Sequence, residues 1–171
     1  MILKKCCGVY AFRIALQITM LALLLAGSAN AVNFTVCPEG CEYSSIQKAI
    51  KASSNGDTIL VSSGTYFENV NVTKQLILRG IGNPVVDARG NGSAITLSAN
   101  GITLEGFTAT GTYSPEAGIR VTSGNNTLIS NNASYNKYGY GIYLFSSSNN
   151  TLTGNKASNN RNGIYLETVK Q

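Results

Sequence analysis

The acidic side chains are the residues that could act as acids or bases, and they are widely spaced. Hydrolysis of a glycosidic bond needs two carboxyl groups about 5 to 10 Å apart, so acids paired on one strand or on adjacent turns of the chain would indicate it. After residue 31, no two acids lie within two residues of each other. Asp87 is the best single candidate, with Arg89 beside it and Glu105 further along. The alternative is that Asp87 accepts hydrogen bonds from turn amides.

Metal chemistry has few ligands to draw on. The sequence has no histidine, and its methionines are Met1 and Met20. Cys37 and Cys41 lie in the segment CPEGC, and in a secreted chain two such cysteines form a disulfide that closes a small loop. A metal site is the alternative, although two thiols are only half of a four-ligand structural site. The sequence therefore predicts the Cys37–Cys41 disulfide, no metal and no cofactor.

Tyrosines near the C-terminal end are candidates for sugar binding, because their ring faces stack on apolar C–H groups while their hydroxyls form hydrogen bonds. If Ile and Leu of the repeated Gly-Ile-Tyr-Leu point inward, its tyrosines point outward on one face. Stacked exposed tyrosines also arise from β propensity alone. The candidate carbohydrate-binding residues are Tyr138, Tyr140, Tyr143 and Tyr165.

The triplet Asn-x-Ser/Thr recurs along the chain and marks acceptors for N-linked glycans in a secreted protein. Asn, Ser and Thr are so common here that such triplets also arise by chance. The candidate glycosylation sites are Asn33, Asn71, Asn91, Asn125, Asn132 and Asn149.

A repeat of 22 to 24 residues organises the chain. The unit Gly-Ile starts at Gly118, Gly141 and Gly163, and the unit Asn-Thr-Leu starts at Asn126 and Asn150. Each repeat holds three short apolar segments that alternate as strands do, separated by Gly, Asn and Ser. Leucine-rich repeats have a similar length but a different leucine spacing and a helical or 3₁₀ side. The pattern predicts an all-β protein, a right-handed parallel β-helix of about five coils, with counterpart strands about 4.8 Å apart.

One segment has helical rather than strand spacing. In Ser44–Ala52, the residues Ile46, Ala49 and Ile50 follow the i, i+3, i+4 pattern, with serines to cap the start and Asn55-Gly56 to end the helix. Such a helix would cover the open end of the first coil. We therefore expect an N-terminal segment with a capping helix at 32–55 and the coils at 56–171.

Residues 1–31 have the order of a secretory signal peptide: basic residues, a short apolar run, then Ala29-Asn30-Ala31. An uncleaved anchor is the alternative, but the apolar run is shorter than the roughly 20 residues of a spanning helix. Cleavage before Val32 removes three of the 13 basic residues and none of the 8 acids, which leaves a net charge of +2. No basic run remains to indicate nucleic acid binding. We expect a secreted or cell-surface protein that contacts a membrane only if this segment stays.

The run from Tyr43 to Gly80 contains the motifs SIQKAI, GDTILV, GTYFENV and LILRG, and NNTL and NGIYL recur later. With these motifs the chain resembles the pectin-lyase-like superfamily, and within it the NosD-type β-helix proteins with carbohydrate-binding and sugar-hydrolase repeats, found on archaeal and bacterial surfaces. The likeness covers nearly the whole chain after the signal peptide. Because the matched motifs are turn and core motifs, they imply the fold more strongly than an activity.

The resemblance implies one alternative function, a polysaccharide lyase or glycoside hydrolase that uses Asp87, Arg89, Glu105 and Arg120. Lyases of the superfamily combine acidic Ca²⁺ ligands with an Arg or Lys base. The Asp-Asp and Asn-Thr-Asp signatures of its galacturonases and the Gln-Asp of its methylesterases are absent. The NosD type also implies copper, whose ligands are His, Met and Cys, and after residue 31 the sequence supplies only the two cysteines of the expected disulfide. We expect a non-catalytic module that is structural or interacts with a polysaccharide or surface glycan.

Two further expectations concern the end of the stack and the contacts between its coils. The sequence stops just after the start of another coil, which predicts either a piece of a longer repeat protein, the favoured reading, or end-to-end pairing of the last coil with another chain. Asn126 and Asn150 lie one coil apart and are predicted to stack as a hydrogen-bonded ladder that serves stability.

Overall fold

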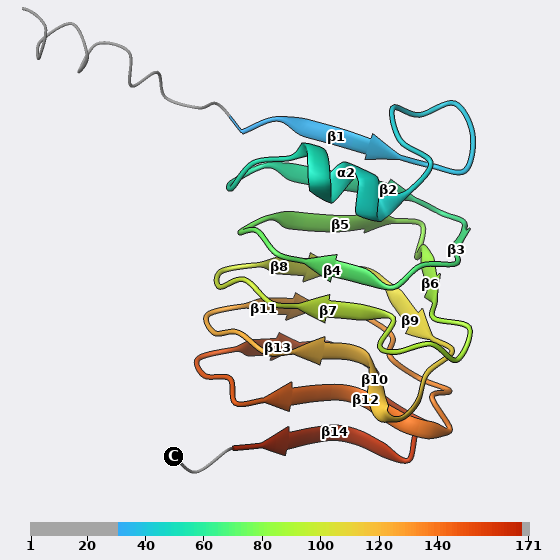
Figure 1. Cartoon of the computed structure of the whole chain (residues 1–171), viewed down its shortest axis with the longest axis vertical. Coiled ribbons are helices and arrows are strands. Elements are labelled where there is room, and N and C mark those ends of the chain that lie inside the picture. The colour runs from blue at the N-terminus through green and yellow to red at the C-terminus, as the bar shows by residue number, and fades with distance from the viewer. Residues whose placement is uncertain (1–30, 169–171) are drawn as a thin grey trace, which may run out of the picture. The chain divides into compact units, whose positions relative to one another are not determined.

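The computed structural model describes residues 31–168, which form a solenoid of short parallel strands around one core (Figure 1). All strand pairs in the described residues are parallel, as the repeat pattern predicts. Apart from its last residue, the predicted signal peptide lies outside the described residues. Within residues 31–168, no helix is long and apolar enough to cross a membrane.

The strands form three sheets that run along the stack. The six-stranded sheet contains, in spatial order, β1 (Asn33–Val36), β2 (Thr58–Ser62), β5 (Ile77–Ile81), β8 (Thr103–Glu105), β11 (Thr127–Ile129) and β13 (Thr151–Thr153). The three-stranded sheet contains β3 (Thr65–Tyr66), β6 (Val85–Asp87) and β9 (Thr108–Thr110). The five-stranded sheet contains β4 (Val70–Val72), β7 (Ile95–Leu97), β10 (Tyr113–Val121), β12 (Tyr138–Phe145) and β14 (Asn162–Glu167).

From β2 onward the chain visits the six-stranded, the three-stranded and the five-stranded sheet in turn, and each round is one coil. In the last two coils, single bridges at Asn132 and Lys156 continue the three-stranded sheet from Thr108. Each coil therefore repeats the path of the coil before it, so that a position in one coil lies beside the equivalent position in the next.

The solenoid has about six turns, one more than predicted. The additional strand is β1, which we expected to be part of an N-terminal segment. It pairs in parallel with β2, and Phe34 lies opposite Ile59. The prediction missed it because β1 precedes the helix and lies outside the repeats.

Columns of apolar side chains fill the core and explain the repeat. Leu78, Leu104 and Leu128 are register partners in the six-stranded sheet and are fully buried. Ile119 and Ile142 are likewise register partners in the five-stranded sheet, and both are fully buried. Burying such a side chain contributes about 1.5 to 3 kcal/mol, so the stacked columns are a main source of stability. The inward direction predicted for the apolar residues of Gly-Ile-Tyr-Leu is confirmed for Ile142, whereas Ile164 and Leu166, its counterparts in the last described strand, are 49% and 69% exposed.

The predicted capping helix is confirmed as α2 (Ile46–Ala52), with Ser45 as its N-cap. Its apolar face, Ile46, Ala49 and Ile50, is buried, and the helix packs against β1, β2 and β4. It ends earlier than Asn55-Gly56, because the backbone is already extended at Ser53.

Side chains fix α2 against the first strand of the five-stranded sheet. The carboxamide of Gln47 accepts from the backbone N–H of Asn71 at 2.7 Å and donates to the carbonyl of Asn71 at 3.2 Å. Gln47 thus pairs with the edge of β4 as a neighbouring strand would, and such pairing satisfies groups that would otherwise be an open edge.

Two charged residues hold the ends of α2. The carboxylate of Glu68 accepts hydrogen bonds from Ser45 and from the backbone N–H groups of Ile46 and Gln47, each at 3.0 Å. A negative charge at the start of a helix is favoured because the first N–H groups have no partner within the helix. At the other end, the ammonium group of Lys74 donates to three backbone carbonyls of the last turn, those of Ile50, Lys51 and Ser53.

Three asparagine ladders run between the coils beside the core. In each ladder the side-chain oxygen accepts a backbone N–H from the preceding coil, and the side-chain nitrogen donates to a backbone carbonyl. The predicted pair is confirmed, since Asn150 Oδ1 accepts from the backbone N and from Nδ2 of Asn126 at 2.9 and 3.0 Å. The two ladders that the prediction missed are Asn131 with Asn155 and Asn136 with Asn160.

The cysteines and Asp57 hold the N-terminal region. The predicted disulfide is present between Cys37 and Cys41, in the loop between β1 and α2. Asp57 accepts the backbone N–H groups of Val32 at 2.8 Å and Ser54 at 2.7 Å, and these bonds hold the pKa of its carboxyl below the usual value. Asp57 therefore has a structural role, as its position in a turn indicates.

Candidate functional site

An aromatic cluster covers part of the outer side of the five-stranded sheet. We call it the tyrosine face and define it by its members on β10, β12 and β14, which are Arg120, Tyr140, Tyr143, Phe145 and Tyr165. Tyr143 of β12 is the register partner of Tyr165 in β14 and also of Arg120 in β10. The parallel pairing of identical repeats thus brings residues from three coils together.

The rings of the tyrosine face pack on one another. Tyr140 and Tyr165 stack with centroids 4.8 Å apart and an angle of 8° between their planes. Tyr143 lies 4.9 Å from Tyr140 and 5.5 Å from Tyr165. Phe145 and the guanidinium of Arg120 also contact Tyr143, so that this ring is only 6% exposed. Tyr143 points outward as predicted but is covered, and the half-buried rings of Tyr140 and Tyr165 form the accessible part.

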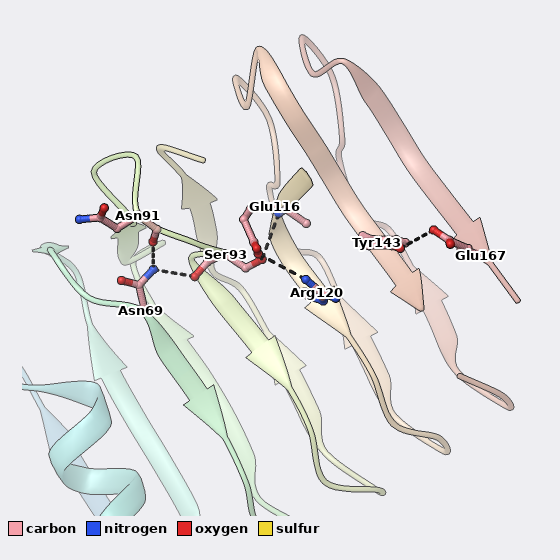
Figure 2. A network of polar contacts seen from close by, with 8 residues as sticks. Asn69, Asn91, Ser93, Glu116, Arg120, Tyr143 and Glu167 are labelled. Atoms are coloured by element: carbon pink, nitrogen blue, oxygen red, sulfur yellow. Dashed lines mark hydrogen bonds and ion pairs between the residues drawn. The ribbon is translucent and has the colours of Figure 1, made fainter. Parts of the chain in front are cut away.

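Two separate groups of polar contacts lie on or beside this face (Figure 2). Figure 2 shows the hydroxyl of Tyr143 directed at Glu167, to which it donates a hydrogen bond of 2.5 Å. The carboxylate of Glu116 lies between Arg120, at 3.5 Å, and the hydroxyl of Ser93. Glu167 is therefore bonded to a tyrosine of the face, and Glu116 to the arginine whose guanidinium lies over that ring.

Burial and the bond to Glu167 raise the pKa of Tyr143 from 10.0 to about 12. A pKa raised on folding means that the folded state holds its proton more tightly than the unfolded chain, so this contribution is complete below pH 10 and is lost as the pH rises toward 12. We expect Tyr143→Phe to flatten the decline of stability over that range. Urea unfolding at a series of pH values would measure this decline.

Some alkaline dependence should remain in Tyr143→Phe, because burial also raises the pKa of Tyr66. Curves of unfolding free energy against pH that run parallel for the natural chain and the variant would show that Tyr143 is not the group responsible.

Tyr138 lies apart from the other three sugar-binding candidates. It begins β12 and stacks on Tyr113 of the preceding coil, with centroids 5.6 Å apart and 16° between the planes. Both rings are more than half exposed. The prediction missed Tyr113 because it lies outside the exact repeat, although its separation of 25 residues from Tyr138 is close to one coil.

The structure does not bring the four catalytic candidates together. Asp87 ends β6 in the three-stranded sheet, and its carboxylate accepts the backbone N–H of Arg89, which follows it, at 2.9 Å. Glu105 lies in the six-stranded sheet and forms an ion pair of 2.8 Å with Arg79. Arg120 lies in the five-stranded sheet. Asp87 and Arg89 are therefore adjacent, and the other two belong to different sides of the coil.

The six candidate glycosylation sites differ in exposure. Asn33, Asn71, Asn91, Asn125 and Asn149 are exposed, whereas Asn132 is half-buried. The side-chain oxygen of Asn132 is enclosed without a hydrogen-bond partner. Asn125 and Asn149 both adopt left-handed backbone angles, with φ of 58° and 56°, in equivalent turns. Glycosylation stays a prediction, and its geometric requirements are least well met at Asn132.

Fold and surface together define a parallel β-solenoid with an aromatic patch on one outer sheet. Residues 50–171 match the family described as "Periplasmic copper-binding protein (NosD)", so the chain belongs to the NosD family. The chain is also similar to a cell surface glycoprotein of Methanothermus fervidus, with 32% identity over 129 residues. That match covers 74% of the chain and 21% of the relative. No solved structure matches the chain.

Copper binding, named in the family's description, does not fit the residues of this chain. Copper takes imidazole, thiolate and thioether ligands. The sequence has no histidine, both methionines and Cys6 and Cys7 precede residue 31, and Cys37 and Cys41 are oxidised to a disulfide. In the described residues, no three His, Cys, Asp or Glu side chains lie close enough together to hold a metal ion.

Proposed function

We propose that this protein is a secreted or cell-surface β-helix module that binds glycans through the tyrosine face and has no catalytic activity. The observation that carries the proposal is the pair of parallel, half-buried rings of Tyr140 and Tyr165, set on the outer side of a rigid sheet. Such rings present flat apolar surfaces with a polar hydroxyl at the edge, which suits the apolar C–H side of a sugar.

The location is supported by the relatives. The description of the family refers to the periplasm, and the relative from Methanothermus fervidus is a protein of the cell surface. A disulfide agrees with an oxidising compartment outside the cytoplasm. The chain spans about a fifth of that relative's length, so in a longer protein the solenoid would be one module among others.

The absence of catalysis is proposed because Asp87, the best catalytic candidate, accepts the backbone N–H of Arg89 and four other acids also have partners. Asp57 and Glu68 bind backbone amides, Glu105 binds Arg79, and Glu116 binds Arg120. A carboxylate engaged in this way is not available as a general acid or base without breaking a contact that supports the fold.

Glycan-array binding by the full chain, followed by titration of the best ligand, tests the proposal. We expect binding that does not require Ca²⁺. Replacement of Tyr165 by leucine should weaken the binding about tenfold, which corresponds to the loss of about 1.4 kcal/mol from one stacked ring.

The matched control is Tyr165→Phe, which keeps the ring and should retain most of the affinity. Equal affinity of the leucine variant and the natural chain would contradict the proposal. A screen of uronans decides the catalytic alternative: a Ca²⁺-dependent product that absorbs ultraviolet light, and that is lost in Asp87→Ala, would establish an enzyme.

A further inference from the structure

We propose that a second surface, separate from the tyrosine face, binds a glycan whose sugars carry negative charge. This surface lies at the corner of the solenoid where β10, β12 and β14 begin. We call it the corner groove and define it by Arg89, Tyr113, Tyr135, Lys137, Tyr138 and Asn159. It goes beyond the proposed function because it names a new site and the charge of its ligand.

The groove crosses four consecutive coils. A hollow of about 220 Å³ reaches from Arg89 and Tyr113 to Tyr138, and a second of about 620 Å³ reaches from Tyr135 and Lys137 to Asn159. Tyr135 and Lys137 line both, so the two hollows are continuous. Four coils are separated by three spacings of about 4.8 Å, roughly 14 Å in all, and a hollow of this shape suits an extended polymer.

The charge of the groove is positive. Arg89 and Lys137 contribute cations from two different coils, and in the described part of the chain no carboxylate lines either hollow. The carboxylate of Asp87 lies beside the first hollow, where it accepts the backbone N–H of Arg89 and packs against Gly111, so one negative charge stands next to the two cations. Arg89 and Lys137 belong to coils two spacings apart, roughly 10 Å along the stack, so an extended acidic oligosaccharide that follows the groove passes both residues.

Aromatic rings stand beside these cations. Tyr113 and Tyr138 are each 54% exposed and stack on one another across the coils. The ammonium group of Lys137 lies 5.5 Å from the centre of the Tyr138 ring. The guanidinium of Arg89 lies 3.4 Å from the centre of the exposed ring of Phe67. The groove thus offers apolar faces for sugar rings together with donors for carboxylate or sulfate groups.

The backbone at the groove adopts conformations that bulky residues seldom take. Arg89 and Tyr135 have φ of 49° and 64°, in the left-handed region, and each lines the groove. The ring of Tyr113 lies so close to Gly90 that a methyl group there would be 2.8 Å from it. Unfavourable backbone angles at side chains that line one hollow are typical of functional sites.

Calorimetric titration of the full chain with oligogalacturonate, and with the same oligomer after methyl esterification, tests the proposal. The ester keeps the shape and removes the charge. We expect the acid form to bind at least about fivefold more tightly, with an affinity that falls as NaCl is raised. Lys137→Gln should weaken binding of the acid form about fivefold or more. Lys48→Gln, the same change at an exposed position of α2, should have no effect.

Each result separates this groove from the tyrosine face. Loss of acid-oligomer binding in Lys137→Gln, with Tyr165→Leu unaffected, supports the corner groove even if the tyrosine face binds nothing. Equal binding of acid and ester, or equal loss in Lys48→Gln, overturns it and leaves the tyrosine face untouched. Tighter binding of oligothymidylate than of any acidic oligosaccharide would assign the groove to nucleic acid and also overturn the proposal.

Discussion

Replacing Asn131 by alanine should lower the free energy of unfolding by about 3 kcal/mol, one of the largest effects expected for a polar residue of this protein. Asn131 is 1% exposed. Its side-chain oxygen accepts the backbone N–H of Phe107 at 3.0 Å, and its nitrogen donates to the carbonyl of Leu104 at 2.9 Å and to Asn155. The variant loses all three bonds and leaves the N–H of Phe107 buried without a partner, which costs more than the bonds themselves.

Urea unfolding followed by circular dichroism would measure the effect. Asn91→Ala is the matched control, since Asn91 is exposed and outside the ladders, and it should change stability by less than about 0.5 kcal/mol. A similar small change for Asn131→Ala would mean that the ladders follow from the fold without stabilising it.

Alanine at Gly141 should also lower stability by about 3 kcal/mol, although only one methyl group is added. A methyl at this position would lie 2.5 Å from the carbonyl oxygen of Gly163 and 2.8 Å from that of Ala133, and closer still to the carboxamide nitrogen of Asn160. Two of these atoms belong to backbone that cannot move without disturbing the next coil. The glycine of the repeated Gly-Ile unit is therefore required by space, because the asparagine ladder occupies the volume beside it.

Gly40→Ala separates this crowding from backbone conformation. Gly40 has φ of 84° and nothing within 4 Å of an added methyl group, so its substitution costs only the left-handed backbone, about 1 to 2 kcal/mol. Thermal melting of both variants would measure the difference. If Gly141→Ala proves no more harmful than Gly40→Ala, the coils are able to shift enough to accept a side chain.

The stacking of the coils could be predicted from the sequence because each coil must bury apolar side chains at the same positions as its neighbours. The Leu104, Leu128 and Leu152 column and the Ile119, Ile142 and Ile164 column were visible as spacings, and parallel register makes such spacings into contacts. The capping helix was readable for a different reason, since its apolar residues follow a helical period.

Three features were missed in the sequence, and the reasons differ. The position of β1 as a strand of the stack depends on its pairing with β2, about 25 residues away, and no repeat signals it. The ladder of Asn131 with Asn155 has the same separation as Asn126 with Asn150, and attention to asparagines five residues apart within each coil would have found it. The burial of Tyr143 required knowledge of what Arg120, Phe145 and Tyr140 cover.

The candidate sites were less predictable than the fold. Tyr143 and Tyr165 lie one coil apart on one face, as the repeat indicates, whereas Tyr138 lies at the corner and stacks on Tyr113. Lys137 could not be predicted as a site residue, because a single lysine in the sequence does not indicate that it shares a groove with Arg89, two coils nearer the N-terminus.

The separation of 24 residues between ladder partners has an evolutionary consequence. Duplication of a gene segment encoding one whole turn would insert a coil whose asparagines meet asparagines, whose leucines meet leucines and whose glycines leave the same space. Such an insertion would need no compensating substitution in its neighbours, and it would lengthen the corner groove by one step. A family built in this way can adjust the length of its surface in whole turns, whereas a partial insertion between two ladder positions would move the asparagines of that coil out of register with their partners.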